Sequence, residues 1–381
     1  MKISILAICR LGVLAAAAIL AGCGSGPSQP AFGPAGTVKN AARPGENPLS
    51  LGRLFSLTTR LGIVPTVYPN HQRSWMAPDA KKKNLLYVSN YYGTTTGHST
   101  VEVDVYHYNP DLTPPKKLLG KLTGFGYPYG ECTDKAGDVF VVDWAKADIV
   151  EYAHGGASPI ATLNDPGYFP IGCSVDPTTG NLAVANFGAV SSSSPGNVAI
   201  YQNASGSPTL YTYQSPAYYL PPGYDNKGNL FVEIQTATGQ KNLLAELPSG
   251  SSTFRTISLS GWTINFPAGI MWDGSYLAGS DQEYKNPNVV DTGIYRIQIS
   301  GSTGTVVSSI RLNDRCASSG NNILAVQPWI QKNRVVAGNL YNSCLYSYGY
   351  WNYANGGFPI KQIPSSIAPE QGWGQTVSKG Q

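Results

Sequence analysis

Residues Phe169–Asn186 read FPIGCSVDPTTGNLAVAN, and this stretch decides the fold because the chain repeats its plan. A proline is followed two residues on by a glycine and six residues on by an aspartate, and then by a glycine-bearing turn and an apolar run. The plan returns in Pro128–Asp134 and Pro267–Asp273, and in shortened form before Asp225. The aspartates recur about every 40 to 50 residues, an interval typical of repeat architectures.

Each repeat carries the signals of four short antiparallel strands. A strand ends near the aspartate, the aspartate and a glycine form a turn, an apolar strand such as VFVV follows, and two more strands complete the unit. A lone sheet of this kind has two bare faces and open edges, so it is stable only when packed in a ring. The sequence therefore predicts an all-β fold, a β-propeller.

We expect six four-stranded blades, and seven stay open as an alternative. The six lie at about 70–121, 122–163, 164–213, 214–259, 260–312 and 313–363. The run EQGWGQTVS, Glu370–Ser378, reads as one more inner strand, which either closes the ring against the first blade or begins a seventh. The run Gly62–Tyr68 can likewise donate a closing strand.

The blade sequences, for example GNVAIYQNASGSPTLYTY, resemble NHL-type and TolB-like six-bladed propellers of secreted bacterial lipoproteins. The resemblance covers nearly all of residues 70–378. It implies the fold and is almost silent on activity, because this architecture hosts many unrelated functions.

The first residues have the pattern of an export signal. A basic start is followed by an apolar run and by LAGC, Leu20–Cys23, which resembles a lipoprotein lipobox. We therefore expect a signal peptide at 1–22, a lipidated Cys23 heading a Gly/Pro/Ser-rich tether at 23–50, and the propeller at 51–381. An ordinary signal peptide is the alternative. The expected location is the cell envelope, lipid-anchored at the outer membrane or cell surface.

The overall composition argues against nucleic-acid binding. Charged residues make up only 13% of the chain, the formal net charge is +4, and there are 43 glycines and 24 tyrosines. This balance suits strands and turns and lacks the basic footprint of a DNA or RNA binder. We expect a monomer without a cofactor, attached to a membrane through its lipid.

Four cysteines remain beyond the signal: Cys132, Cys173, Cys316 and Cys344. In an exported chain they favour disulfides, with three possible connectivities. Cys132 and Cys173 lie on the innermost strands of adjacent blades, which predicts a bridge between blades; Cys316 would then pair with Cys344. Buried free thiols are the alternative. A zinc site is not expected, because no CxxC pair accompanies these cysteines.

Aromatic residues gather in the loops that lead into the inner strands, where they share one phase of the repeat. We consider these rings, with the one carboxylate embedded in the same phase, as a candidate ligand site: Tyr127, Tyr129, Glu131, Tyr168, Phe169, Tyr218, Tyr219, Trp262 and Phe266. Tyrosine offers an apolar face and a hydroxyl, which suits a glycan, a peptide or a protein. The alternative is that the rings pack between neighbouring blades.

Two functions stay open. The first is a non-catalytic, lipid-anchored propeller that binds a ligand or protein partner. The second is a metal-dependent lactonase or hydrolase similar to gluconolactonases, with Glu131 as the first ligand and Asn186 or Asp143 near the axis. We expect no resident metal or catalytic residues, because no set of oxygen ligands recurs clearly, the histidines occupy dissimilar places, and a GxSxG elbow is absent. The binding function is favoured.

Overall fold

A computed structural model describes residues 72–93, 99–109, 118–189, 195–237, 241–286, 289–313, 327–338, 346–364 and 370–380. Within these ranges the chain forms β-strands and two short 3₁₀ turns, Ala80–Lys82 and Gln202–Ala204. These ranges contain no helix with the length and apolar character needed to span a bilayer. The predicted signal, tether and lipidated Cys23, the run Gly62–Tyr68, and Cys316 and Cys344 lie outside the described residues.

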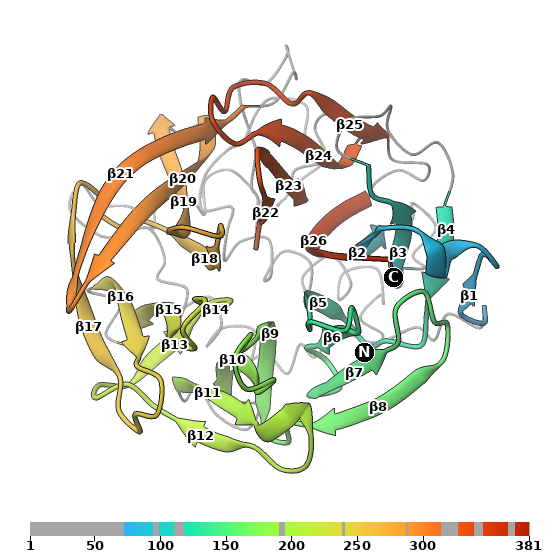
Figure 1. The fold of residues 1–381 in the computed structure, drawn as a ribbon, viewed down its shortest axis with the longest axis horizontal. Helices are drawn as coiled ribbons and strands as arrows, with labels where there is room; N and C mark the ends of the chain where they lie inside the picture. The colour runs from blue at the N-terminus through green and yellow to red at the C-terminus, as the bar shows by residue number, and fades with distance from the viewer. Residues whose placement is uncertain are drawn as a thin grey trace, which may run out of the picture.

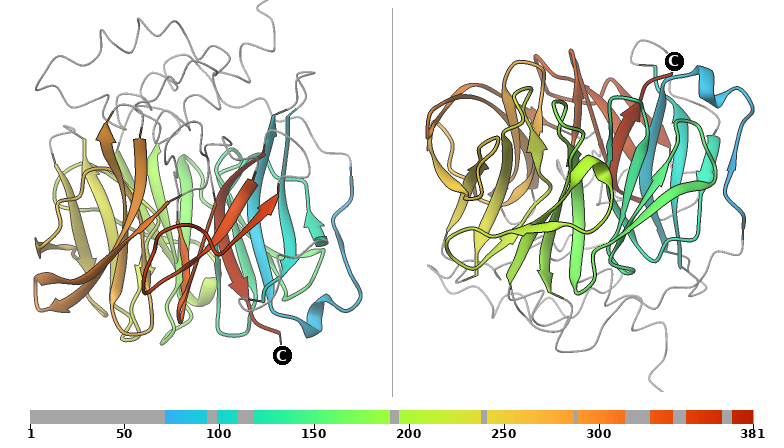
Figure 2. Two further views of the ribbon diagram at one scale, coloured as in Figure 1. Left: turned by 90° about the horizontal axis from the view of Figure 1, so that it is seen from above. Right: turned by 60° about the horizontal axis from the view of Figure 1, so that its bottom comes forward.

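The strands form five hydrogen-bonded sheets that stand side by side around a common axis, as in a propeller (Figures 1 and 2). Three of the sheets have four strands in sequence order. They are β5 (Pro128–Thr133), β6 (Val139–Asp143), β7 (Asp148–Tyr152) and β8 (Pro159–Asn164); β9 (Tyr168–Val175), β10 (Leu182–Ala189), β11 (Pro195–Tyr201) and β12 (Thr209–Tyr211); and β22 (Trp329–Gln331), β23 (Arg334–Gly338), β24 (Tyr346–Asn352) and β25 (Lys361–Pro364).

A five-stranded sheet joins the two ends of the described chain. Its order is β1 (Trp75–Met76), β4 (Leu118–Leu122), β3 (Ser99–His107), β2 (Leu85–Gly93) and β26 (Glu370–Ser378). Strand β26 pairs antiparallel with β2, with Leu85 opposite Ser378. The C-terminal strand thus closes the ring against the first sheet, one of the two places predicted for it.

The remaining strands form one continuous nine-stranded sheet. It contains β13 (Ala217–Tyr219), β14 (Gly223–Tyr224), β15 (Leu230–Thr236), β16 (Asn242–Leu247), β17 (Arg255–Ser260), β18 (Pro267–Trp272), β19 (Leu277–Asn286), β20 (Val289–Ser300) and β21 (Thr303–Leu312). The outer strands β17 and β21 pair in parallel, which fuses what the repeat predicts as two blades. The hydrogen bonds therefore show a propeller-like ring of sheets, but they do not divide it into six separate blades.

The repeated aspartates cap turns, as the sequence predicts. Asp176 Oδ1 accepts hydrogen bonds from the backbone N–H and the hydroxyl of Thr178, both at 2.8 Å. Asp225 Oδ1 accepts from the N–H groups of Lys227 and Asn229 at 2.8 and 2.9 Å. The turn glycine Gly180 has a φ of 76°, a conformation that other residues adopt at a cost.

The glycine two residues after the repeated proline serves a different purpose, which is close packing at the axis. A Cβ added to Gly130 would lie 2.8 Å from the Cα of Gly172 on the neighbouring inner strand. One added to Gly172 would lie 2.7 Å from the Cβ of Pro221. Only glycine lets these inner strands approach so closely, which explains its place in the repeat.

The predicted bridge between Cys132 and Cys173 is present, with the two Cα atoms 5.6 Å apart. It joins the inner strands β5 and β9 of adjacent sheets, which share no ladder hydrogen bonds with each other. The two sheets are therefore covalently tied at their inner ends.

Candidate functional site

Most of the predicted aromatic residues are buried between sheets. Their side chains are at most 8% exposed and belong to one hydrophobic cluster, which includes Tyr127, Tyr129, Phe169, Tyr218, Tyr219 and Phe266. Trp262 belongs to another cluster, where its ring stacks on that of Tyr295 with centroids 4.8 Å apart. Burial raises the pKa of Tyr219 to about 12, as expected for a phenol enclosed by apolar neighbours. In this structure these rings pack between the sheets.

Two aspartates on second strands, Asp143 at the end of β6 and Asp281 within β19, hold the aromatic loops in place. Asp143 accepts hydrogen bonds from the backbone N–H groups of Gly126 and Tyr127, at 2.5 and 2.7 Å. Asp281 accepts in the same way from Asn265 and Phe266, at 2.9 and 2.5 Å. The recurrence of VFVVD and LAGSD is the sequence signal for this role. The oxygens of Asp143, considered above as a metal ligand, are taken up by backbone donors.

Two glutamates are buried beside the inner strands. Glu131 is 2% exposed, and its Oε1 accepts a hydrogen bond from the Ser89 hydroxyl at 2.7 Å. Within the part of the chain that the structure describes, its Oε2 has no hydrogen-bond partner. Glu233, which the sequence reasoning missed, accepts at Oε2 from the N–H groups of Ala268 and Gly269 at 3.0 and 2.8 Å. Burial raises the pKa of both carboxyls well above the usual range, which favours their neutral forms.

Gln327 connects inner strands from different sides of the ring. Its Nε2 donates to the carbonyl of Glu131 at 3.2 Å, and its backbone N–H donates to the carbonyl of Ala268 at 3.0 Å. The Gln375 side chain in turn donates to the Gln327 carbonyl. Together with the close glycine contacts, these bonds join the inner strands near the axis. Among the described side chains, no three His, Cys, Asp or Glu residues are grouped so that they could share a metal.

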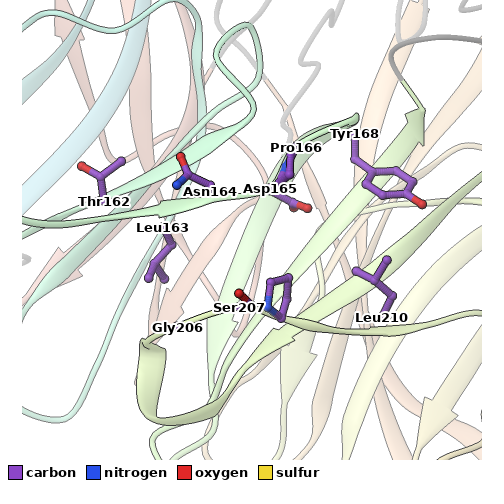
Figure 3. Close-up of a pocket in the computed structure, with 10 residues that line it drawn as sticks. Thr162, Leu163, Asn164, Asp165, Pro166, Tyr168, Gly206, Ser207 and Leu210 are labelled. Atoms are coloured by element: carbon purple, nitrogen blue, oxygen red, sulfur yellow. The ribbon is translucent and has the colours of Figure 1, made fainter.

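A groove with a volume of about 470 Å³ lies at the circumference instead, between the end of β8 and the start of β12 (Figure 3). Its lining is mixed in polarity and contains no lysine or arginine: Thr162, Leu163, Asn164, Asp165, Pro166, Tyr168, Gly206, Ser207, Pro208 and Leu210. Of the nine predicted site residues, Tyr168 alone is only partly buried, and it lines this groove. The structure brings Tyr168 together with residues that the sequence reasoning did not select.

Asp165 is the only charged residue that lines the groove, and it is 1% exposed. Its Oδ2 has no hydrogen-bond partner among the described residues, and in Figure 3 its carboxylate points toward the side where Tyr168 lies. Burial raises the pKa of Asp165 to about 6, although a hydrogen bond with the Asn186 side chain partly offsets the effect. Asn186 donates from Nδ2 to Asn197 at 2.9 Å, and its own Oδ1 has no partner.

The strands that flank the groove are edge strands with exposed apolar side chains. Strands β8 and β12 each end their sheet. Ile160 on β8 is 55% exposed and Leu210 on β12 is 46% exposed. An edge strand presents unpaired backbone donors and acceptors, so it is a natural place for another strand to pair.

The chain matches no protein-family model, and no curated protein matches it. Solved structures do resemble it. A chain from the crystal structure of a nidogen/laminin complex is 11% identical, with a TM-score of 0.52 over 78% of this chain and 99% of that one. A Bacteroides caccae protein of unknown function is also 11% identical, with a TM-score of 0.49 over 78% and 99% of the two chains. The first of these likenesses shows a β-propeller fold and nothing about activity.

Proposed function

We propose that this chain is an exported, lipid-anchored β-propeller that binds a protein partner without catalysis, and that the groove between β8 and β12 is the binding site. In this proposal the nine-stranded sheet counts as two blades joined at their outer strands, so the ring has six blades. The bound partner is an extended segment that pairs with the outer edge of a blade, a recurring mode of peptide recognition.

The observation that supports this proposal is that outer strands of this molecule already pair with additional strands. The short strand β1 pairs antiparallel with the outer strand β4, with Trp75 opposite Lys121. The outer strands β17 and β21 pair with each other. Two kinds of outer edge thus accept an additional strand, whereas β8 and β12 end their sheets on either side of a groove. A segment from a partner can satisfy the backbone groups at such an edge.

The test is selection of binding peptides from a library of random dodecamers displayed on phage. The target is the full chain carrying Cys23→Ser, so that it is not lipidated. We expect binders whose affinity falls at least tenfold with Leu210→Arg, because a long cationic side chain then occupies the groove. Val307→Arg is the matched control, since Val307 is also an apolar residue of an outer strand and is 43% exposed. Binders that are indifferent to Leu210→Arg would refute the groove as the site.

The anchor is tested separately. We expect the wild-type chain to fractionate with membranes and to incorporate radiolabelled palmitate, and we expect the Cys23→Ser variant to do neither. A variant that still sediments with membranes would show that lipid at Cys23 is not the attachment.

The metal-dependent lactonase is kept as a second candidate because Glu131 has a buried oxygen without a hydrogen-bond donor. Buried carboxylates of this kind are either neutral or bound to a cation. Elemental analysis of the purified chain decides between the two. One calcium or zinc per chain that is lost in Glu131→Gln would favour the lactonase, and equal metal content in both proteins would remove this candidate.

A further inference from the structure

The groove is lined by the carboxylate of Asp165, one oxygen of which receives no hydrogen bond from the described residues. No described residue donates a hydrogen bond to Asp165 Oδ2, although Asp165 is only 1% exposed. A buried carboxylate oxygen without a donor is costly, and such groups are normally paired or bound to a cation. The neighbouring Asn186 adds a second buried oxygen that lacks a donor. The two side chains are in contact, since Asn186 hydrogen-bonds Asp165.

The chemistry of the lining selects the kind of cation. A calcium ion takes six to eight oxygen ligands, and Asp165 is the only carboxylate among the residues that line the groove. The volume of about 470 Å³ also far exceeds the space that a single ion needs. An ammonium or guanidinium group needs fewer oxygen ligands than a calcium ion does, because its N–H donors can pair with a single carboxylate. Its methylene stem can lie along apolar side chains such as Leu210 and the ring of Tyr168.

We propose that Asp165 determines the specificity of the groove by pairing with a lysine or arginine side chain of the bound segment. This inference rests on the proposed function, since the segment that carries the basic residue is the one that pairs at the outer edge. The pairing fixes the register of the segment, because a basic residue reaches Asp165 from one position only. Peptides that bind the groove therefore carry a basic residue at a constant place.

The experiment is a double-mutant cycle on a peptide selected with the wild-type chain. Its basic residue is replaced by citrulline or norleucine, and Asp165 is replaced by asparagine, which keeps the shape of the side chain. We expect the peptide change to weaken binding about tenfold in the wild type and less than twofold in Asp165→Asn, as measured by calorimetry. Asp176→Asn is the control, because it removes one negative charge from the same sheet at a turn; here the tenfold loss should persist.

The outcomes separate this inference from the function on which it rests. Selected peptides without a common basic residue, or an equal loss in the wild type and Asp165→Asn, overturn the role of Asp165 even if Leu210→Arg abolishes binding. If no peptide binds the wild-type chain, the groove fails as a binding site and the inference fails with it. Should Asp165→Asn not fold, as judged by its thermal melt, Asp165→Ser supplies the same cycle.

Discussion

Two junctions between successive repeats of the chain differ in how their outer strands are arranged. At the junction of β17 and β21, which we call the seam, the outer strands pair in parallel, with Ser258 opposite Thr303. At the junction of β8 and β12, the outer strands belong to separate sheets and a groove lies between them. The inner strands of the groove junction are instead joined by the Cys132–Cys173 disulfide.

The difference shows that the repeat fixes the inner end of each sheet more strictly than the outer end. Inner strands must approach within the distance that Gly130 and Gly172 allow. Outer strands have more room, so they can pair, accept a short strand such as β1, or stay open. Where the outer strands pair at the seam, over Ser258–Ser260 and Thr303–Thr305, their backbone groups are already used. An open junction can bind a partner but depends on its inner end for stability.

Removal of the disulfide should have the largest effect on stability. The bridge closes a segment with a sequence separation of 41 residues, for which loop-closure entropy gives about 4 kcal/mol. We therefore expect Cys132→Ala/Cys173→Ala to lower the free energy of unfolding by about 3–4 kcal/mol in urea denaturation. The loss arises at the groove junction, because no ladder hydrogen bonds join those two sheets.

Reduction of the wild-type chain provides the control. Dithiothreitol should destabilise the wild type by a similar amount and leave the double-alanine variant unchanged. A further loss in the reduced variant would report a second bridge, which the predicted pair of Cys316 and Cys344 would supply. A double variant as stable as the wild type would contradict the idea that the groove junction relies on its inner tie.

Much of this inner architecture could be predicted from the sequence, because it depends on residues with few alternatives. The turn aspartates and glycines, the disulfide and the closing strand at Glu370–Ser378 all follow from local patterns that recur along the chain. The fusion of β17 with β21 could not be predicted in this way. Pairing between outer strands depends on how far two sheets diverge, which no single repeat encodes.

The candidate site was harder to predict for a related reason. Aromatic residues in the loops suggested a binding surface, but packing between sheets uses the same residue types, and most of these rings are buried. Of the nine predicted site residues, only Tyr168 lines the groove. Asp165 carries no motif, since its Asp-Pro-Gly context is typical of an ordinary turn. Asp165 stands out because no described residue donates a hydrogen bond to its buried Oδ2. This can be recognised only from the three-dimensional structure.

Replacement of Asp165 by asparagine should have an intermediate effect on stability, and this effect should depend on pH. Burial raises the pKa of Asp165 from its ordinary value of 3.8 to about 6 in the folded chain, so the folded state binds the proton more tightly than the unfolded state does. Stability from this group is present below about pH 4 and is lost as the pH rises through 6. We expect the free energy of unfolding of Asp165→Asn, relative to that of the wild type, to rise by on the order of 2 kcal/mol between pH 4 and pH 8.

Urea denaturation of both proteins at several pH values gives this difference directly. Asp148, whose pKa burial also raises to about 6, is present in both proteins and cancels. A difference that is independent of pH would mean that Asp165 is already neutralised or solvated, and the open junction would then hold no unpaired charge. A bound basic peptide should reduce the difference, because it stabilises the ionised carboxylate.

The smallest expected effect is at the seam, where Gly304 faces Leu259 across the parallel pair. A Cβ at Gly304 would lie 2.9 Å from Leu259 Cδ2 and 3.0 Å from Ile297 Cγ2, so Gly304→Ala forces these methyl groups to shift. Overpacking costs about 1–3 kcal/mol, and the reduced freedom of the unfolded chain returns about 0.4–1 kcal/mol. We expect a net loss of about 1 kcal/mol in urea denaturation, against almost none for Ser309→Ala at an exposed position of the same strand. Because the groove that contains Leu210 lies at a different junction, the Gly304→Ala variant should bind selected peptides as the wild type does. A loss of peptide binding in this variant would contradict the separation between closed and open junctions.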